Sequence, residues 1–213
     1  MNTSAQAFGY VHRYLPPSGE DPRTLLLLHG TGGDENDLIP LGQMLAPDAG
    51  LLSPRGTVSE NGAARFFKRL AEGVFDIDDL HARTKDLVAF IEGAASQYKF
   101  DPRQVVAVGF SNGANIAGSV LLSSPPTLNS AVLFRPMVPF VPKSPASLEG
   151  HRVFIGAGET DTIVSRLHPE RLAEMLRVLG ADVTLNWQPT GHALSRADVS
   201  AAYDWLNPSK EVE

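Results

Sequence analysis

Short apolar runs alternate along the chain with longer stretches in which apolar side chains recur at helical spacing. Uninterrupted apolar runs are typical of strands buried on both faces of a parallel sheet, and the helical spacing is typical of amphipathic helices. The runs predict buried strands at 24–28, 105–108, 131–134 and 153–158, and a shorter strand that enters a turn at 51–56. The spacing predicts helices over 80–98, directly after Ser111, over 168–179 and from Ser195 to Leu206.

Two further segments alternate polar and apolar residues, as strands with one buried face do. They are 10–15, which is expected at an edge of the sheet, and 183–187. The regular alternation of strands and helices, with turn signals between them, predicts an α/β fold with a doubly wound, mostly parallel sheet. The chain of 213 residues is long enough for one domain with a substantial core and short for two, so we expect a single domain over 1–213.

The segment 105–117 carries the strongest functional signal in the chain. A β-branched apolar run leads into Gly109-Phe110-Ser111-Asn112-Gly113, and small and apolar residues at helical spacing follow. This is the pattern G-x-S-x-G between a strand and a helix, where glycines permit a turn so tight that the serine is held in a strained conformation above the sheet. Ser111 is therefore the candidate nucleophile, and the alternative is a glycine-rich turn without a catalytic role.

A glycine-rich loop, 29–38, follows the first buried strand. Its glycines let backbone N–H groups approach a ligand, so Thr31 is a candidate oxyanion donor together with Asn112, the residue after the nucleophile. A phosphate-binding loop is not favoured, because neither G-K-[ST] nor G-x-G-x-x-G follows. His29 is interpreted as a residue that holds the shape of this loop. The acidic residues of the loop lack the spacing of calcium ligands and are interpreted as bracing or capping groups.

Acyl transfer at a serine also needs a base and an acid that orients the base. Histidine suits the first role because its unperturbed pKa of about 6.5 lies near working pH, and the order in this type of site is Ser, then Asp or Glu, then His. Asp161 follows the next-to-last predicted strand and His192 follows the last, so both are expected at the edge of the sheet that carries Ser111. Glu159 is the alternative acid, and His168 is the alternative base.

Candidate pocket walls come from two loops. The segment 61–79 mixes aromatic and charged residues without clear periodicity, and its Phe66 and Phe67 either wall a pocket or pack into the core. Pro136 and Met137 follow the strand before the last two, at the carboxyl edge where ligands of open α/β sheets bind. For these two residues the alternative is hydrophobic packing beneath a loop.

Composition narrows the classes of function. The formal net charge is −6 and no basic stripe with interleaved aromatic residues is present, so we expect no nucleic-acid partner. The chain has no cysteine, which excludes disulfides, thiolate metal sites and a cysteine nucleophile and suits a reducing compartment. The N-terminal residues lack the pattern of a signal peptide, and the nearby apolar run 25–28 is too short for a membrane span, so we expect a cytoplasmic protein.

Motifs spread over nearly the whole chain resemble the phospholipase/carboxylesterase family of small α/β-hydrolases, which includes acyl-protein thioesterases. They are His29-Gly30-Thr31-Gly32-Gly33-Asp34-Glu35, Ser53-Pro54-Arg55-Gly56, Arg65-Phe66-Phe67, Gly109-Phe110-Ser111-Asn112-Gly113-Ala114-Asn115, Asp161 and Gly191-His192. The resemblance is closest to the bacterial carboxylesterase branch linked to hydroquinone resistance. It implies an α/β-hydrolase fold without a large cap and a triad of Ser111, His192 and Asp161. It also implies that Thr31 and Asn112 donate to the oxyanion.

The resemblance further implies hydrolysis of short acyl esters as small-molecule substrates, no cofactor, no metal and often a homodimer. One departure from the family pattern is the run 162–165 after Asp161, where a proline or small apolar residue and another proline are expected. The alternatives are a thioesterase that acts on acylated proteins or acyl-coenzyme A, and a ligand-binding protein with an idle triad. A dienelactone-type hydrolase is disfavoured, because that chemistry resembles a cysteine-based elbow and the chain has no cysteine.

Overall fold

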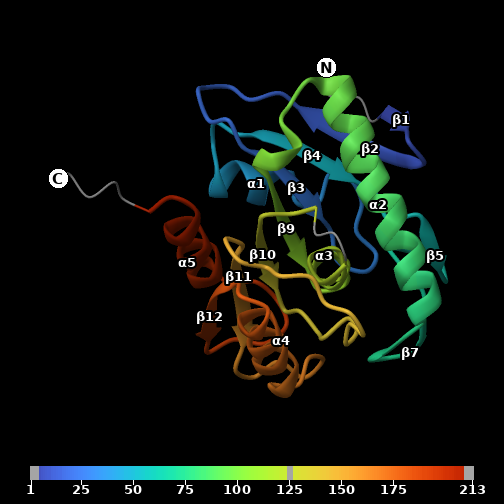
Figure 1. Cartoon of the computed structure of the whole chain (residues 1–213), viewed down its shortest axis with the longest axis vertical. Helices are drawn as coiled ribbons and strands as arrows, with labels where there is room; N and C mark the ends of the chain where they lie inside the picture. The colour runs from blue at the N-terminus through green and yellow to red at the C-terminus, as the bar shows by residue number, and fades with distance from the viewer. Residues whose placement is uncertain (1–4, 124–126, 209–213) are drawn as a thin grey trace.

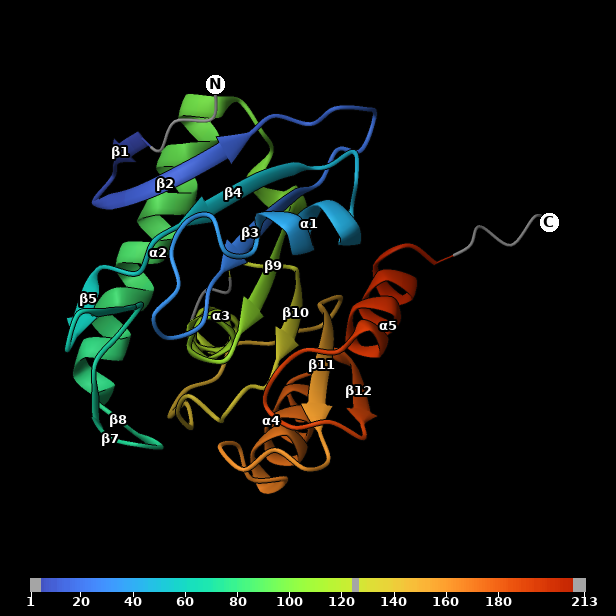
Figure 2. The same cartoon turned by 180° about the vertical axis from the view of Figure 1, so that it is seen from behind.

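The computed structural model describes residues 5–123 and 127–208, and its centre is a sheet of eight strands (Figures 1 and 2). The strands lie in the order β1-β2-β4-β3-β9-β10-β11-β12. The part from β4 to β12 is parallel, and β2 pairs antiparallel with both β1 and β4. The bounds are β1 Ala5–Ala7, β2 Tyr10–Leu15, β3 Thr24–Leu28, β4 Gly50–Pro54, β9 Val105–Phe110, β10 Ser130–Phe134, β11 Arg152–Gly158 and β12 Asp182–Gln188.

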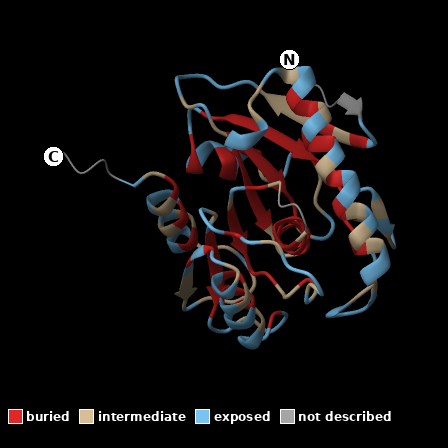
Figure 3. Cartoon of the chain, viewed as in Figure 1, coloured by how far each residue is buried: buried red, intermediate tan, exposed pale blue. Residues whose placement is uncertain are grey.

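Helices cover both faces of this sheet. They are α1 Ile39–Leu45, α2 Ile77–Tyr98, α3 Asn112–Leu122, α4 Leu167–Val178 and α5 Arg196–Leu206, with a 3₁₀ turn at Pro102–Gln104. Successive strand residues point to opposite faces. Accordingly, Leu26 and Leu28 of β3 join one buried cluster with α2, α3 and α4, whereas Leu25 and Leu27 join a second cluster with α1 and α5. Figure 3 shows buried strands at the centre of the sheet and α3 buried along its whole length, whereas α2, α4 and α5 expose one face. The predicted doubly wound, mostly parallel sheet is confirmed.

No helix in residues 5–123 and 127–208 combines the length and the apolar character that a membrane crossing requires.

The predicted elements are present, and the differences are local. The outer strand on the N-terminal side is β1, so β2 is the second strand rather than the edge. With three residues, β1 is too short to show a pattern. α2 begins before the predicted residue 80, because the Asp76 carboxylate accepts from the Asp79 N–H and caps the helix. α1 was not predicted; it has seven residues, and Leu38, the residue at its N-cap position, makes no capping hydrogen bond with its side chain.

The segment 61–79 is more regular than its sequence suggests. β5 Val58–Glu60 and β6 Ala63–Arg65 form one antiparallel hairpin, and β7 Arg69–Ala71 and β8 Val74–Phe75 form another. Figures 1 and 2 place both hairpins beside the N-terminal end of α2. This segment therefore borders the carboxyl edge of the sheet, where the candidate site lies.

Candidate active site

Ser111 occupies a sharp turn between β9 and α3. Its backbone has φ 52° and ψ −111°, a conformation that is strained for a residue with a side chain. A Cβ on Gly109 would lie 2.6 Å from the Gly113 carbonyl oxygen, and a Cβ on Gly113 would overlap the Leu28 carbonyl oxygen of β3. The Ser111 N–H donates to the Phe134 carbonyl oxygen at the end of β10 (2.9 Å). The turn therefore depends on both glycines of G-x-S-x-G and is anchored to the neighbouring strand.

This strain predicts an unusual effect on stability. Ser111→Gly should be more stable than Ser111→Ala by about 1 kcal/mol, because both variants lack the hydroxyl and only glycine adopts this backbone conformation without strain. The gain is reduced by the greater backbone entropy of glycine in the unfolded chain. Urea unfolding of the two variants measures the difference. Equal stability, or a less stable glycine variant, would show that the turn stores no strain at this position.

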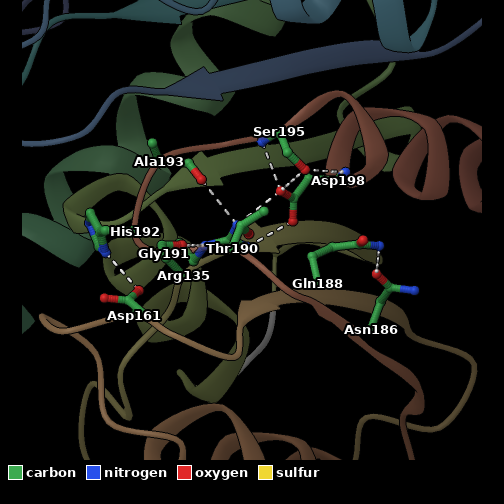
Figure 4. A network of polar contacts seen from close by, with 10 residues as sticks. All are labelled: Arg135, Asp161, Asn186, Gln188, Thr190, Gly191, His192, Ala193, Ser195 and Asp198. Atoms are coloured by element: carbon green, nitrogen blue, oxygen red, sulfur yellow. Dashed lines mark hydrogen bonds and ion pairs between the residues drawn. The ribbon is translucent and has the colours of Figure 1, made fainter.

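His192 lies between Ser111 and Asp161. Its Nε2 is 3.0 Å from Ser111 Oγ, and its Nδ1 is 2.8 Å from Asp161 Oδ2. With Nδ1 protonated and donating to the carboxylate, Nε2 is the nitrogen that can accept a proton from the serine. The loops after β11 and β12 carry Asp161 and His192, and Figure 4 shows the pair side by side. The structure thus brings together the three residues that the sequence selected.

Asp161 is held in its ionised form. Burial is the largest influence and would raise its pKa, but hydrogen bonds from the Val164 N–H, the His192 ring and the Ile163 N–H together hold the pKa below its usual value. Oδ1 accepts from the N–H groups of Ile163 (2.8 Å) and Val164 (3.0 Å). The run 162–165, which departs from the family pattern, therefore forms a turn that closes on the carboxylate itself.

The alternative acid and base lie outside this arrangement. Glu159 is exposed just after β11. His168 is in the first turn of α4, where its Nδ1 accepts from the Val138 N–H (3.3 Å). Within residues 5–123 and 127–208, neither side chain hydrogen-bonds to Ser111 or His192.

The loop 29–38 is braced by the groups that the sequence suggested. His29 Nδ1 donates to the Gly30 carbonyl oxygen (2.6 Å), and His29 Nε2 accepts from the Gly56 N–H (2.9 Å). Burial is the main cause of the lowered pKa of His29, which favours the neutral ring that these two bonds require. Glu35 accepts a bidentate pair of bonds from Arg55 (2.6 and 2.9 Å). The interpretation as loop-bracing groups is confirmed for His29 and Glu35.

Thr31 is held against the hairpin β5–β6. Arg65 Nη1 donates to Thr31 Oγ1 (2.6 Å), and the Ala64 carbonyl oxygen accepts from the Gly32 N–H (2.9 Å). The Thr31 N–H itself has no acceptor within the part of the chain that the structure describes. The loop is therefore fixed through its side chain and the next residue, and the Thr31 N–H is left available.

Asn112 is fixed in a similar way. Its side chain is buried, and its Oδ1 accepts from the Phe66 N–H (2.8 Å). As the first residue of α3, it carries one of the N–H groups that have no acceptor within a helix. Asn112, Thr31 and Ser111 line the same cavity. Two N–H donors beside a serine are what an oxyanion hole requires.

This cavity has a volume of about 50 Å³. Besides Ser111, its walls include Arg69 and Glu72 of the hairpin β7–β8, Met137 after β10 and Ile163 after Asp161. A larger groove of about 970 Å³ runs along α2 and the segment 140–144, and the predicted site residues do not line it. The small cavity is therefore the one to consider for the chemistry of Ser111.

Of the four residues predicted to wall a pocket, Met137 lines the cavity and the others do not. Phe66 and Phe67 are 0% exposed and belong to the larger core cluster. Pro136 is buried too. The segment that holds the hairpins turns Phe66 and Phe67 into the core, whereas Phe75 and charged residues such as Arg69 line the cavity.

Two buried charges that the sequence did not single out hold the loop that carries His192 (Figure 4). Arg135 directly follows β10, and the side chains of Arg135 and Asp198 are both 0% exposed. The guanidinium donates to both oxygens of Asp198 (2.8 and 2.9 Å). It also donates to the carbonyl oxygens of Gly191 (3.0 Å) and Ala193 (3.2 Å), on either side of His192.

The sequence contains a signal for Asp198 but none for Arg135. Ser195 and Asp198 have the spacing of a capping box, and the structure has the reciprocal hydrogen bonds of that motif at the start of α5. An arginine after a buried strand reads as an exposed loop residue, because charged side chains are almost never fully buried without a partner.

A doubly wound sheet with a strained serine at the tip of a strand-to-helix turn is the architecture of the α/β-hydrolases, and this structure has that fold. Within that class, residues 63–207 match the sequence model of the dienelactone hydrolase family. The chain belongs to the dienelactone hydrolase family. We expected the absence of cysteine to disfavour a dienelactone-type hydrolase, and the family match shows that this expectation was wrong for family membership. At the elbow position this member has Ser111.

Relatives carry hydrolase and carboxylesterase names. MhqD of Bacillus subtilis (strain 168), named as a hydrolase, is 46% identical over 193 residues, which cover 91% of this chain and 96% of that protein. The crystal structure of the Bacillus cereus carboxylesterase is 46% identical with a TM-score of 0.89, over 91% of this chain and 92% of that one. The carboxylesterase from Mesorhizobium loti is 30% identical with a TM-score of 0.90, over 97% and 99% of the two chains. The chain is thus a hydrolytic enzyme of the dienelactone hydrolase and carboxylesterase type.

Proposed function

We propose that this enzyme hydrolyses short-chain carboxylic esters through an acyl-enzyme on Ser111. The observation that supports the proposal most directly is the series of hydrogen bonds from Ser111 Oγ through His192 to Asp161, at 3.0 and 2.8 Å. A serine hydroxyl is a weak nucleophile by itself, and a base within hydrogen-bond reach, oriented by a third group, activates it. The strained turn at Ser111 adds to this support, because such strain is concentrated at functional sites.

In the acylation half-reaction, His192 Nε2 takes the proton of Ser111 while Oγ attacks the ester carbonyl carbon. Asp161 accepts from Nδ1–H and stabilises the imidazolium that forms. The carbonyl oxygen becomes an oxyanion and accepts hydrogen bonds from the N–H groups of Thr31 and Asn112. The intermediate then collapses, the bond to the alcohol oxygen breaks, and His192 returns its proton to the leaving group.

In the deacylation half-reaction, water takes the place of the alcohol. His192 removes a proton from the water as it attacks the acyl carbonyl, and the same two N–H groups receive the second oxyanion. Collapse breaks the bond between the acyl carbon and Oγ, and the proton on His192 passes to Ser111. The products are a carboxylic acid, an alcohol and the starting enzyme.

The size and charge of the cavity favour a small acyl group. The cavity beside Ser111, at about 50 Å³, is small, so it has less room for a long acyl chain than for a short one. A long acyl chain would also lie against Glu72 and the ion pair of Arg69 with Glu60 (2.8 Å), and it would take these charged groups out of water at a cost. We therefore favour small esters over the long-chain thioesters of acylated proteins.

A series of p-nitrophenyl esters of increasing acyl length tests the proposal. We expect kcat/KM to be greatest for acetate to butyrate and to fall by about tenfold or more at octanoate, which corresponds to about 1.4 kcal/mol of transition-state stabilisation. Thioesters of the same acids, measured in parallel, separate the choice of leaving group from the choice of acyl length. A rising trend to octanoate or longer chains would favour the thioesterase alternative, and no hydrolysis of any ester would overturn the proposal.

A further inference from the structure

His192 lies in a loop whose neighbouring side chains can form few contacts with the rest of the protein. Its neighbours along the chain, Gly191 and Ala193, have no polar side chain, so hydrogen bonds that hold this part of the loop are made mainly to backbone carbonyl oxygens. Arg135 donates hydrogen bonds to both carbonyl groups, from Nε to the Gly191 oxygen and from Nη2 to the Ala193 oxygen. Arg135 Nη2 also donates to Thr190 Oγ1 (3.0 Å). One side chain thus holds the loop before and after the histidine (Figure 4).

The same strand end holds the nucleophile. The Phe134 carbonyl oxygen accepts from the Ser111 N–H, and the next residue along the chain is Arg135. The Arg135 N–H donates to the Gly156 carbonyl oxygen of β11 (2.8 Å), and its backbone has φ 56°. Two consecutive residues at the end of β10 therefore fix both partners of the hydrogen bond between Ser111 and His192.

We propose that Arg135, locked by Asp198, is a positioning residue that sets the place of His192 relative to Ser111. The inference rests on the proposed function, because the loop has a catalytic purpose only if His192 is the base. Arginine suits this role because its planar fork presents its N–H donors in a fixed geometry. Nε donates to Gly191 and Nη1 to one Asp198 oxygen. The two N–H groups of Nη2 are shared among the Ala193 carbonyl oxygen, the Thr190 hydroxyl and the other Asp198 oxygen.

Asp198 keeps this arginine in place. Burial is the largest influence on its pKa and would raise it, but hydrogen bonds from Arg135 and from the Ser195 N–H and hydroxyl hold the pKa below its usual value. The Ser195 N–H and hydroxyl both donate to Oδ2 (2.8 and 2.7 Å). Since Ser195 also caps α5, the carboxylate links the guanidinium to the rigid start of that helix.

The packing beneath the loop leaves it little room to move. A Cβ on Gly158, at the end of β11, would overlap the carbonyl oxygens of Thr190 and Gly191. The loop backbone therefore lies directly on the strand, and Arg135 closes it from the side. We refer to Arg135 and Asp198 together as the clamp. A change in the clamp should shift the His192 ring.

The test removes the clamp without leaving a buried charge alone. The double variant Arg135→Met/Asp198→Asn replaces both buried charges with uncharged side chains, and the asparagine oxygen can still accept a hydrogen bond from Ser195. We expect kcat for a short ester to fall about a hundredfold with KM within twofold, because displacements of about 1 Å in a catalytic group have effects of this size. We also expect loss of the downfield proton resonance of His192 Nδ1–H bonded to Asp161, recorded below the melting temperature of the variant.

A matched control exists at the other end of the same helix. Arg23, paired with Asp21 at 2.6 Å, donates to the Leu206 carbonyl oxygen (2.8 Å) and to Asn207 Oδ1 (2.8 Å) at the end of α5. Arg23→Met with Asp21→Asn removes an arginine–aspartate pair of the same kind, more exposed than Arg135 and Asp198 (24% and 13%), at the end of α5 opposite to Ser195. It should lower the melting temperature while kcat stays within twofold and the downfield resonance remains.

Thr190→Val decides the matter if the double variant does not fold. It removes one acceptor of Arg135 and keeps the shape of the side chain, and we expect a three- to tenfold fall in kcat at unchanged KM. Unchanged kcat in either clamp variant, with the downfield resonance retained, would overturn the positioning role. If the unmodified enzyme neither hydrolyses esters nor reacts with a fluorophosphonate, the proposed function fails instead, and the resonance alone then judges the clamp.

Discussion

Replacing Ser111 by alanine should lower kcat for a short-chain ester by about a millionfold. The hydroxyl supplies the atom that becomes acylated, so its removal leaves only the weaker acceleration that comes from substrate binding and the oxyanion donors. The measurement is ester turnover together with intact-protein mass after incubation with a fluorophosphonate. One adduct on the unmodified enzyme and none on Ser111→Ala would establish an activated serine at this position.

A second serine at the other end of α3 serves as the control. Ser123 is the C-terminal capping residue of the helix that Ser111 begins, and its hydroxyl donates to the Ser119 carbonyl oxygen (2.7 Å). Ser123→Ala should keep its turnover and its single adduct. If Ser111→Ala retains turnover, the acyl-enzyme mechanism is wrong. If the folded, unmodified enzyme forms no adduct, the idle-triad alternative gains support.

Replacing His192 by alanine should cost about as much as the loss of Ser111, because the two residues act as a unit and each is useless without the other. The double variant Ser111→Ala/His192→Ala should then be no slower than either single variant. The measurement is the turnover of one short ester by the unmodified enzyme, the two single variants and the double variant, at equal protein concentration. Additive losses in the double variant would mean that His192 acts on a step that does not involve Ser111.

His168→Asn is the matched control for this residue. His168 is the alternative base from the sequence, and an asparagine oxygen can replace its Nδ1 as the acceptor for the Val138 N–H. The variant should keep kcat within about twofold, since His168 has no hydrogen bond to Ser111 in the described residues. A large loss in His168→Asn with a small loss in His192→Ala would reverse the assignment of the base.

The sequence determined those features that depend on neighbours along the chain. Continuous apolar runs revealed the buried strands, and apolar side chains repeated at helical spacing revealed most of the helices. A segment that is buried on two faces, or along one stripe, leaves such a pattern among neighbouring residues. The turn around Ser111 could be predicted because Gly109 and Gly113 leave a recognisable pattern in the sequence. Both glycines are needed where the backbones of β9, α3 and β3 come close together. Asp161 and His192 could be selected because parallel strands end at one edge of a sheet.

The tertiary structure decided what depends on contacts between distant segments. Phe66 and Phe67, between the two hairpins, pack into the core rather than line the cavity, and a local mixture of aromatic and charged residues does not say which side chains face the core. Arg135 and Asp198 are 63 positions apart, and only the adjacency of the end of β10 to the loop after β12 brings them together. The physical reason is that periodicity records how exposed a segment is, whereas the pairing of two buried charges depends on the register of strands that the sequence pattern does not specify.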